Sequence, residues 1–166
     1  EKLLELLIEC KKEEIHTCVD TSGFSKSETL LEVAKYTDLF LYDLKHMDSK
    51  KHFDATGVKN DLILKNLKFL AEMGNEIIIR IPLISGYNDD DKNIEDTIKF
   101  IKSLNRNDIE VNLLPYHNIA SKKYEKYRKA VFILPVKFTL FPLWSCQTTR
   151  TFVNSFAITA TINEVE

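Results

Sequence analysis

Four short runs rich in Val, Ile and Leu recur along the chain and constrain its fold more than any other feature. Segments with the helical periodicity of apolar residues separate them, and successive runs start roughly 24 to 37 residues apart, the size of a βα unit. The runs are continuous rather than alternating, which is typical of parallel strands covered by helices. The predicted strands span residues 15–21, 39–45, 76–84 and 109–116.

Four helices are predicted before and between these strands, at residues 2–13, 26–36, 60–73 and 92–104. In the third of them, Leu64, Leu67 and Leu70 share one face, and Gly74 follows its end as a helix-terminating residue. Alternating helices and strands indicate an α/β fold, either an open parallel sheet or part of a (β/α) barrel.

The composition changes after Lys129. Between residues 130 and 163 only Lys137 and Arg150 are charged, and the apolar stretch 130–144 is broken by two prolines. That stretch is too short and too interrupted to span a membrane, whereas the Thr-rich stretch 148–162 predicts one or two β segments. We therefore expect a partial barrel over residues 1–129 and a divergent, apolar, β-prone tail over residues 130–166.

Charge and cysteine content narrow the classes of protein. The chain has 23 Lys and Arg against 25 Asp and Glu, so no basic excess favours nucleic acid or an anionic membrane as a partner. Three scattered cysteines do not form a disulfide framework, which favours a cytoplasmic location. No leader peptide is visible, and a chain that opens on Glu1 is expected to start within something longer.

Polar residues stand at or near the carboxyl end of each predicted strand, where parallel α/β folds build their sites. Asp43 and Lys45 are two positions apart and therefore project from the same face of their strand. Together these residues supply cations, anions and an imidazole, which suits a zwitterionic ligand with a carboxylate, an amine and hydroxyls. The candidate site residues are Asp20, Thr21, Asp43, Lys45, Arg80 and His117.

Each of these residues also has a purely structural interpretation. Arg80, inside an apolar strand, needs either an anionic ligand or a bridge to another strand through Asp20 or Asp43. Lys45 and Asp43 could form an internal salt bridge.

The same holds at the other two strand ends. Asp20 and Thr21 could begin a turn into Gly23, and His117 could be an ordinary surface histidine.

Four motifs carry a resemblance to a known family. They are the 15–24 stretch, Asp43-Leu-Lys45 with Met47-Asp48 behind it, the 80–86 stretch Arg-Ile-Pro-Leu-Ile-Ser-Gly, and Leu113-Leu-Pro-Tyr-His117. In order and spacing, from about residue 1 to 127, the chain resembles the glycyl-radical-enzyme activating enzymes. These are radical S-adenosylmethionine proteins typified by pyruvate formate-lyase-activating enzyme. The resemblance implies a (β/α)6 barrel in which the present strands are the third to the sixth.

The resemblance also implies cofactors and roles. In the family, a [4Fe–4S] cluster reduces S-adenosylmethionine to a 5′-deoxyadenosyl radical, which abstracts hydrogen from a glycine of a partner such as pyruvate formate-lyase. Asp43 would lie beside the cosubstrate or the partner's glycyl loop, and a monovalent cation could bind near the first strand end, at Asp20 and Thr21. The residues expected to hold the carboxylate, ribose or adenine of the cosubstrate are Asp20, Thr21, Lys45, Arg80 and His117.

Two departures from the family pattern concern the cluster and the tail. The family's Cys-x-x-x-Cys-x-x-Cys loop and Gly-Gly-Glu strand end do not occur here, and the expected role of Cys10, Cys18 and Cys146 is as inert core residues. The abrupt change after Lys129 is the second departure. We therefore expect a partial chain without the cluster-binding part, inactive in isolation and without stable binding of either cofactor.

Two other classes of protein stay open. A non-catalytic, partner-binding half-barrel would expose the edge of the 15–21 strand to self-association, unless the 131–162 tail covers it. A lyase or aldolase would use Lys45, beside Asp43, to form a Schiff base with a carbonyl substrate.

Overall fold

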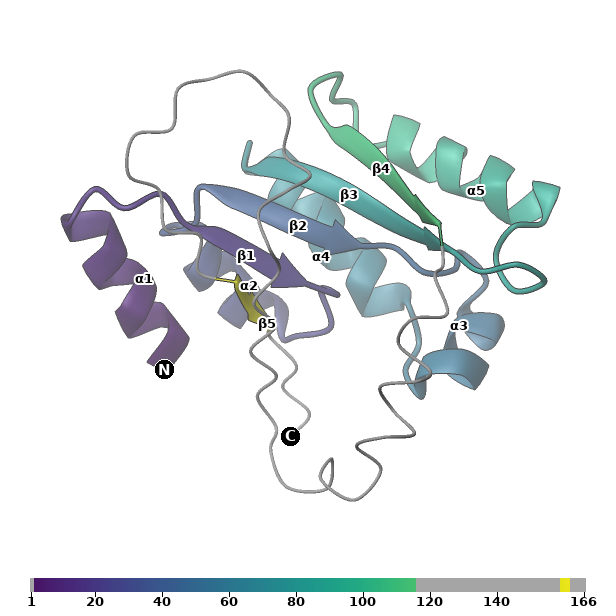
Figure 1. Ribbon diagram of the computed structural model, residues 1–166, viewed down its shortest axis with the longest axis horizontal. Coiled ribbons are helices and arrows are strands. Elements are labelled where there is room, and N and C mark those ends of the chain that lie inside the picture. Colours follow the sequence, from purple (N-terminus) through teal and green to yellow (C-terminus); the bar gives the residue numbers. More distant parts are fainter. Residues whose placement is uncertain (1, 116–158, 162–166) are drawn as a thin grey trace.

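A parallel sheet forms the centre of the computed structural model, which describes residues 2–115 and 159–161 (Figure 1). Its strands lie in the order β4-β3-β2-β1-β5, and every neighbouring pair is parallel. The four predicted strands are confirmed as β1 (Cys18–Thr21), β2 (Leu39–Asp43), β3 (Glu76–Leu83) and β4 (Glu110–Pro115).

The four predicted helices are present, and one helix was not predicted. The predicted ones are α1 (Lys2–Lys12), α2 (Ser27–Ala34), α4 (Asp61–Glu72) and α5 (Asp91–Lys102). The additional helix, α3 (Ser49–Thr56), has little apolar periodicity. Its ends define it instead, because the Asp48 carboxylate accepts hydrogen bonds from the Lys50 and Lys51 amides, and Gly57 ends it with φ of 81°.

Helices α2 and α4 lie behind the sheet in Figure 1, and the core fills the space between them and the strands. The side chains that alternate onto this face are almost fully buried. Those of Val19, Phe40, Tyr42, Ile77 and Ile79 are at most 2% exposed. This alternation fixes which strand positions enter the core and which reach the opposite face.

The opposite face of the sheet, here called the open face, carries the half-buried residues that alternate with the core positions. Asp20, Leu41, Asp43, Ile78 and Arg80 belong to it. Among the described helices, none covers this face as α2 and α4 cover the core face (Figure 1). A one-sided helical cover is the arrangement of a barrel wall, in agreement with the predicted partial barrel.

The edge of β1 is paired in this structure. The short strand β5 (Thr159–Thr161) runs parallel to it, with Cys18 opposite Thr159 and Asp20 opposite Thr161. The Thr-rich stretch therefore contributes a β segment at these three residues, and this segment lies along the edge that the half-barrel alternative left open to self-association or to cover by the tail. The predicted boundary after residue 129 lies outside the described residues. Within residues 2–115, no helix has both the length and the apolar character needed to cross a bilayer.

A tight turn after β1 connects the sheet with α4. Gly23 has φ of 73°, and its amide donates a hydrogen bond to Thr21 Oγ1 over 2.9 Å. The buried Tyr42 hydroxyl lies where a Cβ at position 23 would stand, and it donates to the Ile63 carbonyl over 2.7 Å. Burial of this phenol raises the pKa of Tyr42 far above its ordinary value, so it remains a donor. Three elements thus meet at a position that only glycine fits.

We expect Gly23→Ala to lower the free energy of unfolding by about 3 kcal/mol. Roughly 1 to 2 kcal/mol comes from the left-handed backbone, and the rest from displacing the Tyr42 hydroxyl from its acceptor. Urea titration measures the loss. Gly74→Ala is the matched control, because Gly74 has φ of 80° but open space around the position of its Cβ. Equal losses in the two variants would show that Tyr42 does not restrict position 23.

Candidate functional site

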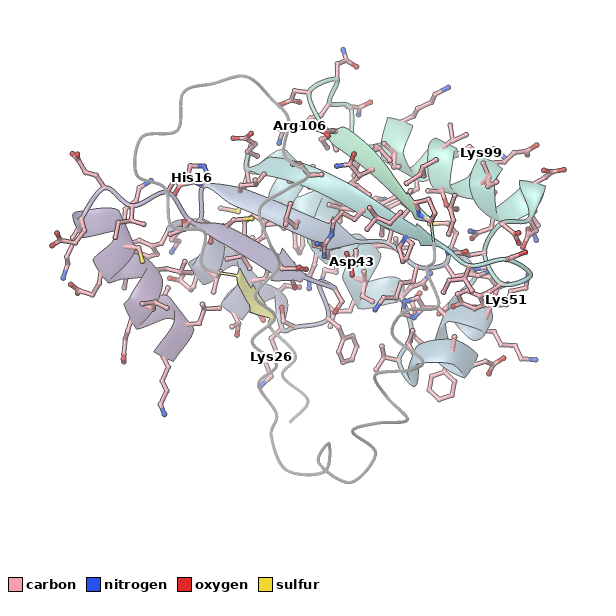
Figure 2. All side chains as sticks on the ribbon, viewed as in Figure 1. His16, Lys26, Asp43, Lys51, Lys99 and Arg106 are labelled. Atoms are coloured by element: carbon pink, nitrogen blue, oxygen red, sulfur yellow. The ribbon has the colours of Figure 1, made fainter. Side chains whose placement is uncertain are left out.

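Three charged side chains come together on the open face, Asp20 and Asp43 from the carboxyl ends of β1 and β2 and Arg80 from within β3. The sheet register places Asp43 directly opposite Arg80. The Arg80 guanidinium donates from Nε to Asp43 Oδ1 over 2.9 Å, and its Nη2 contacts both Asp43 and Asp20. The structure therefore shows the strand-bridging arrangement, one of the two interpretations of Arg80. Figure 2 labels Asp43, which lies near the carboxyl end of β2.

The charged cluster of Asp20, Asp43 and Arg80 is partly buried but open to a ligand. Its side chains are 19–26% exposed. Burial raises the pKa of the Asp43 carboxyl, and Arg80 offsets only part of that effect. Burial alone would lower the pKa of Arg80, but Asp43 and Asp20 outweigh it and raise that pKa. One guanidinium thus faces two carboxylates, which leaves an excess of negative charge when both are ionised.

Lys45 lies two residues beyond the end of β2 and adds a second cation. Its charge favours the ionised form of Asp43, although the ion pair of Asp43 is with Arg80. Lys45 and Asp43 also border a cavity of about 350 Å³ between the β1–α2 loop, the end of β2 and α3. The residues that line this cavity are Ser22, Phe24, Asp43, Lys45, His52, Thr56, Val58 and Ile63.

The other two candidate residues are not part of this cluster. The Thr21 side chain is 1% exposed, lies on the core face and accepts from the Gly23 amide, as a turn residue does. A monovalent cation near Asp20 and Thr21 stays a prediction. His117 lies outside the described residues.

Buried asparagines at the ends of the strands were missed by sequence reasoning. Asn66 donates to the Gly23 and Ser25 carbonyls, and Asn60, Asn88 and Asn93 contact the loop after β2. A signal existed at Asn66, which is 0% exposed and lies between Ile63 and Leu70 on the apolar face of α4. A polar amide at a core position indicates a fixed set of hydrogen-bond partners.

The described residues offer no place for an iron–sulfur cluster. Cys10 is on α1 and Cys18 on β1, both buried, and Cys146 lies outside the described residues. No group of three or more His, Cys, Asp or Glu within residues 2–115 could hold a metal ion. The expectation that this chain lacks cluster ligands stays a prediction.

We expect Arg80→Met to destabilise the fold by about 2 kcal/mol at pH 7, because two partly buried carboxylates lose their cation. The folded-state pKa of Asp43 already lies above 3.8, and the loss of Arg80 raises it further. Above the folded-state pKa of Asp43, its ionised carboxylate without a cation lowers the free energy of unfolding. Protonation of that carboxyl at lower pH removes this loss. The difference from the unchanged protein should therefore shrink as the pH falls through the pKa of Asp43 toward 3.8.

The measurements are urea titrations across this pH range and NMR titration of the Asp43 carboxyl. Arg106→Met is the control, since Arg106 donates to the Asn75 carbonyl at the other end of β3 and should leave the Asp43 titration unchanged. An Asp43 titration that is the same with and without Arg80 would contradict the assigned ion pair.

Several known proteins are similar to this chain. Residues 1–114 match the radical SAM superfamily. The trans-4-hydroxy-L-proline dehydratase activating enzyme of Clostridioides difficile is 54% identical over 122 residues, which cover 72% of this chain and 40% of that protein. The choline trimethylamine-lyase activating enzyme of Oleidesulfovibrio alaskensis is 39% identical over 128 residues, which cover 76% of this chain and 41% of that protein. The chain thus spans about 40% of the length of these relatives.

A solved structure agrees with these relatives. A domain of pyruvate-formate lyase-activating enzyme from Bacteroides vulgatus superposes with a TM-score of 0.65 at 43% identity, covering 69% of this chain and 71% of that domain. The sequence matches and the superposed structure therefore agree on the family of this chain. The chain belongs to the radical SAM superfamily and, within it, to the activating enzymes of glycyl radical enzymes.

Proposed function

We propose that this chain is the part of a radical SAM activating enzyme that positions S-adenosylmethionine for the formation of a glycyl radical on a partner enzyme. The observation that carries the proposal is the charged cluster of Asp20, Asp43 and Arg80, with Lys45 beside it, at the carboxyl ends of β1 and β2 and the adjoining part of β3. That is where parallel α/β folds bind their ligands.

The charges of the cluster match those of the cosubstrate. The excess negative charge of Asp20 and Asp43 over Arg80 suits an amine or a sulfonium, and Lys45 suits a carboxylate. Because these groups are partly buried, their interactions with a ligand are screened less than at a fully exposed surface.

Each residue would bind or orient the ligand rather than react with it. Asp43 and Asp20 would face the cationic part of the ligand, and Lys45 would bind its carboxylate. Arg80 would hold both aspartates in place and would be free to share its donors with a ligand oxygen. When bound, S-adenosylmethionine supplies the radical chemistry, while the protein supplies position and electrostatics.

The second cofactor of the superfamily does not fit the described residues. Two buried cysteines on different elements cannot form a three-thiolate site, so no step is assigned to a cluster here. We propose that the chain of 166 residues is inactive on its own.

Anaerobic reconstitution of the chain with iron and sulfide should therefore give no [4Fe–4S] EPR signal. It should also give no 5′-deoxyadenosine from S-adenosylmethionine in the presence of dithionite. A rhombic or axial [4Fe–4S]⁺ signal in proportion to protein would contradict the proposal.

Binding of the cosubstrate gives a separate test. Without a cluster the chain should bind S-adenosylmethionine weakly, with shifts of backbone amide signals near Asp20, Asp43 and Lys45 in an NMR titration. Lys45→Ala should weaken this binding about tenfold, which corresponds to one lost charge-assisted hydrogen bond. Lys99→Ala, a change on the exposed surface of α5, should have no effect. The absence of saturable shifts in the unchanged chain would contradict the assigned site.

The partner is proposed from the relatives. Their names describe activation of a dehydratase and of a lyase, and we propose that the partner here is likewise a glycyl radical enzyme. Pull-down of the inactive partner enzyme by the unchanged protein measures that interaction. The same pull-down with Asp43→Asn tests whether the charged cluster takes part in it.

A further inference from the structure

The loop that carries Lys45 leaves the sheet at a point where the backbone ladder between β2 and β3 stops. The last ladder bond there runs from the Leu44 amide to the Arg80 carbonyl over 2.9 Å. Along a strand, alternate residues direct their N–H groups to the same neighbouring strand, so the next donor from β3 toward β2 would be residue 82. That residue is Pro82, which has no N–H.

Beyond the end of that ladder, the side chain of Asn88 links the two chain segments. It is 1% exposed, and its Nδ2 donates to the Lys45 carbonyl over 2.8 Å and to the Pro82 carbonyl over 2.7 Å. Its Oδ1 accepts from the Ile84 amide over 2.8 Å. Both donors of this buried amide, and its oxygen, are thus bonded to backbone groups at the ends of β2 and β3.

Two further asparagines hold the residues that follow Lys45. Asn60 donates to the carbonyls of His46 and Met47, over 2.9 and 2.8 Å. Asn93 accepts from the Met47 amide and donates to the Asn88 carbonyl, both over 2.9 Å. The backbone carbonyls of residues 45, 46 and 47 thus each accept a hydrogen bond from an asparagine side chain, although these residues belong to no strand or helix.

From this geometry we propose that Asn88 is a positioning residue that sets where Lys45 projects beside the charged cluster. The inference rests on the proposed function for the role of Lys45, but the positioning itself is a property of the chain alone. Asn88 reaches Lys45 only through its backbone carbonyl, so it acts on the direction of the side chain and not on the ligand. The Arg80 carbonyl anchors the preceding residue, which leaves position 45 as the first one that depends on Asn88.

The first experiment compares amide NMR spectra of the unchanged chain with those of Asn88→Ala and of Asn75→Ala. Asn75 is the matched control, because its amide donates to the Ala34 carbonyl over 3.0 Å at the opposite end of β3. We expect the signals of residues 44–48 to shift or broaden in Asn88→Ala and to stay in place in Asn75→Ala. If Asn88→Ala does not fold, Asn88→Ser, which keeps a donor and an acceptor, takes its place. Unchanged signals at residues 44–48 in a folded variant overturn the inference.

The second experiment is a double-mutant cycle on the affinity for S-adenosylmethionine, measured by NMR titration. Lys45→Ala and Asn88→Ala should each weaken binding, by about tenfold for Lys45→Ala and somewhat less for Asn88→Ala. The double variant should bind within about twofold of Lys45→Ala, because Asn88 acts through Lys45. A purely structural role would not produce this lack of additivity, and fully additive losses overturn the inference.

Failure of the proposed function has a different signature. An affinity that Lys45→Ala leaves unchanged would remove Lys45 from the site, whereas the spectra of residues 44–48 would still decide whether Asn88 fixes the loop.

Discussion

The bridge from Arg80 to Asp20 and Asp43 is the interaction on which the open face of the sheet depends. It joins three neighbouring strands at the level where the pairing between β2 and β3 ends. Without a cation, two carboxylates would stand side by side in a partly buried place, and the strands would repel each other there. With it, the face is polar, partly exposed and still stable, which is what a binding site for a charged ligand requires.

Periodicity in the sequence was sufficient to predict most of the architecture. Continuous Val, Ile and Leu runs and amphipathic segments predicted four strands and four helices, because burial on a sheet or on one helix face leaves a clear pattern. Helix α3 was missed because the Asp48 cap and Gly57 define it rather than an apolar stripe. Local chemistry of that kind leaves a much weaker signal in the sequence.

The residues that meet in the charged cluster could be picked out from the sequence, but their contacts could not. Polar residues at the strand ends predicted Asp20, Asp43, Lys45 and Arg80, but the choice between a ligand and a bridge at Arg80 depends on the register of β2 against β3. Register is set by the packing of the crossover helices, which a single sequence does not specify. Asn66 left a signal on the apolar face of α4, but Asn60, Asn88 and Asn93 did not. An amide in a loop or at a helix end looks the same in the sequence whether it faces water or a carbonyl group.

The contact between Gly23 and the Tyr42 hydroxyl also bears on how this fold can vary in sequence. The phenol occupies the volume that any side chain at position 23 would need, and its hydroxyl is bound to a carbonyl of α4. Positions 23 and 42 therefore form one steric unit. A side chain at position 23 should avoid the steric part of the loss in stability only together with a smaller residue at position 42, and then with another donor or a water molecule for the Ile63 carbonyl. A smaller residue at position 42 alone would leave the turn without a clash but would take the donor from the Ile63 carbonyl, whereas a side chain at position 23 alone would displace the phenol.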